Sequence, residues 1–221
     1  MRILHPQWRS PSALAIASFI RHVAPLCSAA AKGSIPPKTP SQLYVPAPHP
    51  CFLPPEQLLK ECDIMNTKGS GPGGQHRNKV QTAVVIKHLP TKVAGQASES
   101  RSQKSNMDNA IIRLRVKLAV SCRTQSEPPQ PPPADVAYQP SSLWAGRVKG
   151  GKLSINQRHT DFPAVLCEAL DCIWREQDVK AASTQLGIST SQMVKLLAKE
   201  PTALQLVNGL RASSGLPPLR N

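Results

Sequence analysis

The chain has 221 residues, of which 23 are proline and only 4% are aromatic. This composition argues against one continuous core, because several stretches cannot bury enough apolar surface to offset the entropy of the chain. The formal net charge is +14, and residues 57–120 carry eleven Lys and Arg against four acids, a local balance of +7. Such a segment favours a polyanion such as RNA, although a basic surface without any partner would have the same composition.

The first 33 residues have the composition of an organelle transit peptide. Residues 1–33 contain Arg2, Arg9 and Arg21, several serines and small apolar residues, and no acid. Leaders of this kind direct proteins to organelles, and a secretory signal is the alternative. The apolar run ends at Arg21 and is too short to span a membrane, so no membrane partner is expected. We expect a mitochondrion, with a plastid as the alternative.

The six cysteines do not form a recognisable metal or disulfide pattern. They are scattered without a C-x-x-C pair, and no histidine stands at zinc-ligand spacing from them. We therefore expect reduced thiols in an intracellular compartment and no metal site.

The chain changes character after residues 34–56, whose richness in Pro, Ser and Thr predicts a disordered linker. Residues 69–75 contain four glycines and a proline, which predicts an exposed loop. The β-branched stretch 82–89 then predicts a strand, and residues 93–97 could pair back onto it.

A helix is predicted over residues 108–120, where apolar residues recur at helical spacing, with Asn106 or Asp108 as its cap. The basic residues expected on its exposed side are Arg113, Arg115 and Lys117. Residues 57–120 therefore predict a small α+β unit from which a glycine-rich loop projects.

Several kinds of protein carry glycine-rich loops. A phosphate-binding P-loop requires G-x-x-x-x-G-K-[ST], and a dinucleotide fingerprint requires G-x-G-x-x-G within a βαβ unit. Neither pattern occurs here. Glycine content alone would therefore favour a plain flexible linker.

The literal sequence is more specific than the glycine content. Four separated stretches carry the signal: Gly71-Pro72-Gly73-Gly74-Gln75, then Asn78-Lys79, then Ala83 to Pro90, and Arg101-Ser102-Gln103 with Asn106. On these residues, roughly 60–120 resembles the catalytic domain of class I peptide chain release factors. A bare Gly-Gly-Gln triplet would be weak, but the four stretches match in order and spacing.

The resemblance implies ribosome-dependent hydrolysis of the ester that joins a nascent peptide to tRNA, with Gly73, Gly74 and Gln75 as the catalytic residues. Glycine lacks a Cβ, so the backbone can approach the ester closely. The family comparison implies that the backbone N–H of Gln75 stabilises the developing oxyanion or the leaving hydroxyl, while its side chain helps to admit water. Gln75 is also a possible methylation site. No side-chain nucleophile, metal or cofactor is required.

The polar residues that flank the motif are predicted to contact RNA: Arg77, Asn78, Lys79, Arg101, Gln103 and Lys104. Taken one by one, the charged residues among them could be ordinary solvated charges. The neighbouring His76 is read as a surface or RNA-contacting residue, not as a general base. The expected partners are the large ribosomal subunit, ribosomal RNA and peptidyl-tRNA, bound by a monomer.

The roughly 25 Pro-rich residues between the predicted transit peptide and the predicted catalytic unit show no candidate codon-reading motif, so we expect the chain to resemble the short, codon-independent relatives that rescue stalled ribosomes. The function predicted is peptidyl-tRNA hydrolysis in translation termination or in the rescue of stalled organellar ribosomes. The first alternative is a non-catalytic, ribosome-associated RNA-binding factor that kept the fold. A nucleic-acid-binding regulator is a third possibility, but it would leave the Gly-Gly-Gln motif unexplained.

A second unit is predicted after a Pro-rich linker over residues 121–143. Residues 144–221 read as a helical module, in which 178–199 have a helix-turn-helix pattern. A small structural bundle is the alternative, and the basic stretch 144–152 reads as an RNA-contacting arm or a linker. The predicted fold class is α+β, with a small Gly-Gly-Gln domain of release-factor type followed by a small helix-turn-helix-like module.

Overall fold

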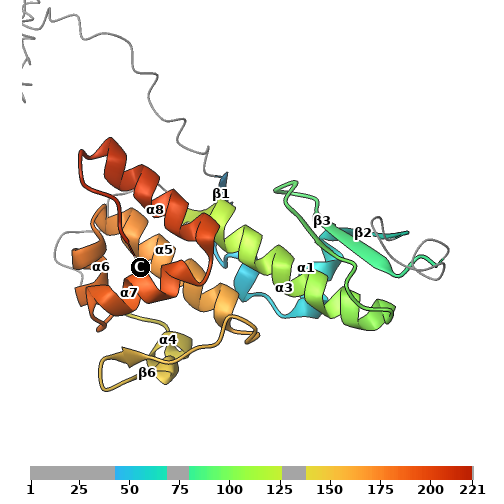
Figure 1. Ribbon diagram of the computed structural model, residues 1–221, viewed down its shortest axis with the longest axis horizontal. Helices are drawn as coiled ribbons and strands as arrows, with labels where there is room; N and C mark the ends of the chain where they lie inside the picture. Colours follow the sequence, from blue (N-terminus) through green and yellow to red (C-terminus); the bar gives the residue numbers. More distant parts are fainter. Residues whose placement is uncertain (1–42, 69–79, 126–137, 221) are drawn as a thin grey trace, which may run out of the picture. The chain divides into compact units, whose positions relative to one another are not determined.

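The structure is a computed structural model that describes residues 43–68, 80–125 and 138–220. These ranges contain both helices and strands, which confirms the mixed class predicted from the sequence (Figure 1). No helix in these ranges is long and apolar enough to cross a membrane. The transit peptide predicted over residues 1–33 lies outside the described residues.

A three-stranded antiparallel sheet has the strand order β2–β3–β4. Its strands are β2 (Cys62–Thr67), β3 (Ala83–His88) and β4 (Ala94–Ala97). Val84 and Ile86 of β3 point into the core, as alternate residues of a half-buried strand do. The strands predicted over 82–89 and 93–97 are confirmed. The sequence pattern does not predict β2, which is mostly exposed but pairs along its whole length with β3.

Helix α3 (Gln103–Ser121) covers this sheet. It begins earlier than the helix predicted over 108–120, and Ser102 caps it by accepting a hydrogen bond from the Ser105 N–H at 3.4 Å. Neither of the two predicted caps is therefore correct. The buried core of this part consists of Val45, Leu58, Val84, Ile86, Ala97, Ala110, Leu114, Leu118 and Cys122.

The backbones of β4 and α3 approach each other most closely at Gly95. A Cβ atom added to Gly95 would lie 2.5 Å from the carbonyl oxygen of Ala110 and 2.6 Å from the backbone nitrogen of Leu114. Backbone atoms of a packed helix cannot turn aside as the end of a flexible side chain can. The contact between strand and helix therefore requires glycine at this position.

The prediction of a disordered linker over residues 34–56 is wrong for residues 43–56, which are folded. Their elements are β1 (Leu43–Pro46), the 3-10 helix η1 (Pro50–Phe52) and the start of α1 (Pro55–Lys60). Strand β1 pairs in parallel with β5 (Cys122–Gln125), which directly follows α3. Val45 and Cys51 are buried, so a few apolar side chains are enough to fix this proline-rich segment on the core.

Four helices follow in the C-terminal part: α5 (Phe162–Glu176), α6 (Val179–Gln185), α7 (Thr190–Ala198) and α8 (Pro201–Ser213). Helix α5 is buried on most of its surface. Helices α6 and α7 are joined at Gly187, whose φ of 66° lies in the left-handed region that favours glycine. Ser189 caps α7 by accepting a hydrogen bond from the Gln192 N–H at 3.3 Å. The largest buried side chains of this core are Trp144, Phe162, Leu166, Ile173, Met193, Leu196 and Leu197.

The basic stretch 144–152 is packed on these helices. It belongs to α4 (Ser142–Arg147) and to a short hairpin of β6 (Val148–Lys149) and β7 (Lys152–Leu153). Trp144 is buried, and its Nε1 donates a hydrogen bond to the carbonyl oxygen of Leu186 at 2.9 Å. The stretch is therefore part of the folded helical region and not a linker.

A buried carboxylate fixes the chain just before α4. The Glu168 carboxylate on α5 accepts hydrogen bonds from the Ser141 N–H at 2.7 Å and from the Ser141 hydroxyl at 2.5 Å. It also accepts one from the Tyr138 hydroxyl at 3.2 Å. Burial, and then the charge of Glu168, raise the pKa of Tyr138, so the phenol stays protonated as the donor. The C-terminal end of the stretch predicted as a Pro-rich linker is thus anchored.

Helix α3 contributes to both cores (Figure 1). Ala110, Leu114 and Leu118 face the sheet, whereas Val116 and Val120 pack against the helical core. The sheet and the C-terminal helices are therefore not two independent modules, because they share one helix.

Replacing Gly95 should test this close packing. Gly95→Ala forces a Cβ into the α3 backbone, so we expect it to lower the free energy of unfolding by about 2–3 kcal/mol in urea denaturation. Gly209→Ala in α8 is the matched control, because nothing lies within 4 Å of a Cβ there. In an open helical position alanine is the better residue, so the control should be neutral or more stable by up to about 1 kcal/mol. Equal unfolding curves for the two variants would contradict the packing described.

Candidate functional site

The glycine-rich segment connects β2 to β3. Thr67 and Ala83 are paired across the two strands, so the segment leaves and re-enters the sheet at neighbouring positions. Residues 69–79 lie outside the described residues. The predicted site residues in that range are Gly73, Gly74, Gln75, Arg77, Asn78 and Lys79. The structure therefore describes only the ends of the strands that flank this segment. We call these paired ends, Thr67 of β2 and Ala83 of β3, the base of the segment.

Asn106 ties the base of the segment to the start of α3. Its side chain is fully buried, and Nδ2 donates to the carbonyl oxygens of Thr82 at 2.7 Å and Ser100 at 2.8 Å. Its Oδ1 accepts from the Ser100 N–H at 2.9 Å. Both amide hydrogens and the amide oxygen are thus used on backbone groups. Asn106 thereby holds the residue that precedes β3 against the turn that precedes α3.

Three predicted RNA-contacting residues lie in that same turn. Arg101, Gln103 and Lys104 are exposed and flank Ser102, the cap of α3. Because Asn106 joins this turn to Thr82, all three side chains lie close to the base of the glycine-rich segment. The fold thus places these three residues beside Thr82, whereas the other predicted group, Arg77, Asn78 and Lys79, lies outside the described residues.

A small hollow of about 170 Å³ lies next to the paired residues Thr67 and Ala83. It is lined by residues of β2, β3 and β4 and by the ion pair between Arg113 and Glu99, which are 2.6 Å apart. The hydrogen bond from Arg113 holds the pKa of the Glu99 carboxyl below its usual value. Both side chains are well exposed, so the pair contributes little to stability and mainly orients the two groups.

Of the three basic residues predicted on the exposed side of α3, Arg113 and Lys117 are exposed and Arg115 is not, and all three donate hydrogen bonds within the protein. Arg113 is engaged by Glu99 and by the carbonyl oxygen of Gln96. Arg115 is half-buried and donates to the carbonyl oxygen of Cys51 at 2.5 Å. Lys117 donates to a carbonyl oxygen of β4 at 2.8 Å. These long cationic side chains donate hydrogen bonds to backbone carbonyl oxygens that the sheet and η1 leave unpaired. The helical periodicity of the sequence does not reveal these contacts.

The described residues around the hairpin base offer no side-chain nucleophile with an adjacent base. Residues 98–104 contain serines but no histidine or cysteine. The nearest histidine in sequence, His88, lies at the opposite end of β3. Its ring is buried and contacts Thr91 Oγ1 at 2.8 Å and Glu61 Oε2 at 3.2 Å, which makes it a structural residue of the β3–β4 turn.

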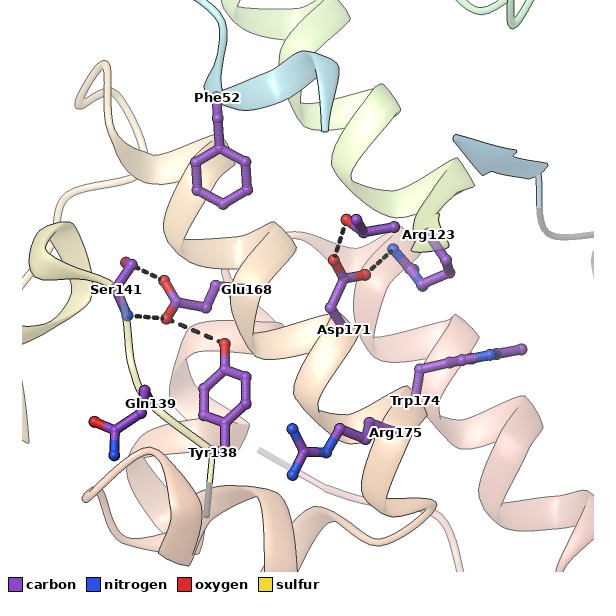
Figure 2. A pocket seen from close by; sticks show the side chains of 10 residues that line it. Phe52, Arg123, Tyr138, Gln139, Ser141, Glu168, Asp171, Trp174 and Arg175 are labelled. Carbon is purple, nitrogen blue, oxygen red and sulfur yellow. Dashed lines mark hydrogen bonds and ion pairs between the residues drawn. The ribbon is translucent and has the colours of Figure 1, made fainter. Parts of the chain in front are cut away.

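A larger cavity of about 540 Å³ is lined by residues of η1, β5, α5 and the stretch 138–141, and no sequence motif suggests this lining (Figure 2). Two acidic residues of α5 point toward it, and both are already engaged. Glu168 binds Ser141 and Tyr138, and Asp171 accepts a hydrogen bond from the Thr124 hydroxyl at 2.8 Å. Burial raises the pKa of Asp171, and the nearby Arg123 guanidinium opposes this effect.

Comparison with known proteins assigns the N-terminal part of this fold. A family model described as RF-1 domain matches residues 58–143. This range contains the sheet, the glycine-rich segment and α3. It therefore includes both predicted groups of site residues.

The relatives of known name are release factors. The chloroplastic peptide chain release factor PrfB1 of Arabidopsis thaliana is 48% identical over 73 residues, which is 33% of this chain and 15% of that protein. Peptide chain release factor 1 of Xylella fastidiosa is 47% identical over 58 residues, 26% of this chain and 16% of that protein. Peptide chain release factor 2 of Buchnera aphidicola is 49% identical over 51 residues, 23% of this chain and 14% of that protein.

The chain thus spans about 15% of the length of these relatives. The matches show that residues 58–143 carry an RF-1 domain and that the chain is similar over part of its length to peptide chain release factors.

Proposed function

We propose that this chain hydrolyses the ester of peptidyl-tRNA on the ribosome, with Gly73, Gly74 and Gln75 as the catalytic residues. The observation that carries the proposal is that the RF-1 domain match covers the segment with this motif. The geometry of the base supports it, because a reactive loop needs a fixed platform. Here the paired ends of β2 and β3 and the buried Asn106 supply that platform.

The proposed chemistry uses backbone and amide groups. The N–H of Gln75 donates to the oxyanion that forms when water attacks the ester carbonyl, or to the leaving hydroxyl of the tRNA. The Gln75 side chain, which is both donor and acceptor, orients the water. Gly73 and Gly74 let the backbone approach the ester without a Cβ in the way. This scheme needs no metal or other cofactor at the loop, and methylation of Gln75 would tune the fit of its amide.

RNA contact at the base would aim the loop. Arg101, Gln103 and Lys104 are exposed next to it, and we propose that they bind ribosomal RNA together with Arg77, Asn78 and Lys79. Arginine and lysine neutralise phosphates, which gives affinity without base specificity. The partners are thus the large ribosomal subunit, its RNA and peptidyl-tRNA, bound by a monomer.

The setting we propose is an organelle, and the function there is the rescue of stalled ribosomes or translation termination. The arginine-rich, acid-free residues 1–33 support import, and one relative is a chloroplastic release factor, so a plastid and a mitochondrion are both open. In this scheme residues 57–120 act as the hydrolase domain and 144–221 as an accessory module.

We propose that the accessory module docks on the ribosome through its helix-turn-helix-like pair. Helices α6 and α7 meet at the Gly187 turn, with Leu186 and Ile188 buried on either side of it. On α7, Lys195 is exposed, whereas Lys199 donates to the carbonyl oxygen of Ile155. Because α7 exposes few polar side chains, we propose that it contacts RNA phosphates and does not read bases.

The first test is the release of labelled peptide from ribosomes stalled at the end of a truncated mRNA. Gly74→Ala should reduce the release rate by at least about 100-fold, because it adds a Cβ at the closest approach. Gln75→Pro, which lacks the N–H, should cost about 100- to 1,000-fold, and Gln75→Ala, which keeps the N–H, should cost less. Ser70→Ala in the same segment is the matched control and should keep the wild-type rate.

A second set of ribosomes, halted with a stop codon in the decoding site, distinguishes rescue from termination. Preferential release from the truncated mRNA supports rescue. Firm binding of the wild-type chain to both kinds of ribosome without any release would instead favour the non-catalytic RNA-binding factor.

Asn106 should act as a positioning residue for the loop. Asn106→Ala removes three hydrogen bonds from buried backbone groups, so we expect a loss of about 2–3 kcal/mol in unfolding free energy. The release rate should fall about tenfold more than ribosome binding, because the loop loses its fixed base. Ser105→Ala on the same turn is the control, since its side chain makes no hydrogen bond recorded among the described residues. An Asn106 variant that stays folded and releases peptide normally would contradict the positioning role of Asn106.

The docking proposal predicts a charge effect on α7. Lys195→Glu should weaken binding to ribosomes about 3- to 10-fold at moderate salt and lower the salt dependence of the dissociation constant. Lys180→Glu, an exposed reversal of charge on α6, is the matched control and should bind as the wild type does. Equal weakening by both variants would indicate a general charge effect instead of docking through α7.

A further inference from the structure

Three side chains with metal-binding atoms meet in the interior between η1 and α5. They are His49, which caps η1, Cys51 within η1, and Cys167 on α5. Their candidate ligand atoms all lie within 4.8 Å of one another, and all three residues are buried. No sequence motif joins them, because the fold brings α5 next to a segment more than a hundred residues earlier in the chain.

One ring nitrogen of His49 lies beside the Cys51 thiol. Its Nδ1 lies 3.0 Å from Cys51 Sγ and accepts a hydrogen bond from the Cys51 N–H at 3.2 Å. An acceptor nitrogen carries the lone pair, so Nδ1 is the ring nitrogen directed at the thiols. The other ring nitrogen, Nε2, is buried without a hydrogen-bond partner among the described residues.

The two thiols lie next to each other in the interior, in contact with Ala119 of α3. A thiol gives up its proton when it binds a divalent metal, so two neighbouring thiols beside an imidazole are a donor set from which a metal ion can displace the protons.

Asp171 stands at the edge of this cluster. It lies one helical turn after Cys167, and its Oδ2 is 3.8 Å from Cys167 Sγ. Its Oδ1 has no hydrogen-bond partner in the described structure, although the Arg123 guanidinium is 3.7 Å away. Asp171 also lines the cavity of Figure 2, so an ion could reach the cluster from that side.

We propose that His49, Cys51, Cys167 and Asp171 bind one zinc ion. One nitrogen, two sulfurs and one carboxylate oxygen are a donor set that Zn²⁺ accepts in tetrahedral sites. Bonds of about 2.0–2.3 Å put tetrahedral ligand atoms about 3.3–3.8 Å apart, so the ligand atoms of His49, Cys51 and Cys167, which lie within 4.8 Å of one another, need only small side-chain shifts. Asp171 lies outside this group of three and would approach the ion from the side of Cys167, whose Sγ is 3.8 Å from its Oδ2. The charges also balance, because one zinc ion and the buried Arg123 offset two thiolates and one carboxylate.

The role of the ion would be structural. It would join the 3-10 helix that precedes the RF-1 domain to α5 of the C-terminal part, next to Ala119 of α3. Arg115 of α3 already donates hydrogen bonds to the carbonyl oxygens of Cys51 and Thr160. The ion would add a further link between the same two parts of the chain. This inference does not depend on the proposed hydrolysis.

The test measures metal in the full-length chain, purified under reducing conditions without chelators. Elemental analysis should give about one zinc per chain. Replacement by Co²⁺ should produce the intense visible bands of a tetrahedral ion together with sulfur-to-cobalt charge-transfer absorption in the near ultraviolet. Stripping with a strong chelator should lower the thermal midpoint by at least about 5 °C, and added zinc should restore it.

Variants assign the ligands. Cys51→Ser and Cys167→Ser should each lose most of the metal and the charge-transfer band, and Asp171→Asn should weaken binding while it keeps that band. Cys62→Ser is the matched control, because Cys62 lies outside the cluster and is only partly buried. It should retain one zinc per chain.

Two results would overturn the proposal. The first is a wild-type chain that folds normally, holds no zinc as purified and gains no cobalt spectrum. The second is a Cys51–Cys167 disulfide, seen as the loss of two hydrogens in the intact mass before reduction. Both measurements are made on the wild-type protein, so they decide the question even if a ligand variant fails to fold.

Discussion

The structure depends on the burial of α3 on two opposite sides. Ala110, Leu114 and Leu118 close the sheet core, and Val116 and Val120 of the same helix pack against the C-terminal helices. A helix packed in this way cannot shift toward one partner without opening a gap at the other, since protein interiors are close-packed. Thr82, which follows the glycine-rich segment, is bonded to Asn106 in the first turns of α3, so α3 connects this end of the sheet to the C-terminal helices.

The sequence predicted the parts of the fold in which local pattern and tertiary packing agree. Strands β3 and β4 followed from a β-branched run and a turn. The start of α3 was missed because its first turn, Gln103 to Asn106, is polar and lacks the apolar periodicity that marks the rest. The proline-rich residues 43–56 looked disordered by composition, yet Val45 and Cys51 are enough to attach them to a core supplied by distant elements.

The candidate site shows the same division. Motif order predicts a catalytic loop and an RNA-contacting role for Arg101, Gln103 and Lys104. It could not show that Asn106 bonds to Thr82, because in sequence this asparagine resembles a helix cap. Contacts between side chains that lie far apart in the sequence could not be predicted from the sequence. The histidine and cysteines that meet between η1 and α5 come from three positions with no shared spacing.

The parallel pairing of β1 with β5 limits how far the chain can be shortened from its N-terminal side. Leu43 is the partner of Cys122, and η1 follows β1 by a few residues. A cut a few residues after Leu43 would remove β1 and expose the backbone of β5 as an open edge, which invites pairing with other chains. Leu43 is therefore the first residue that this pairing uses, and the removal of any leader has to stop before it to keep the edge of β5 covered.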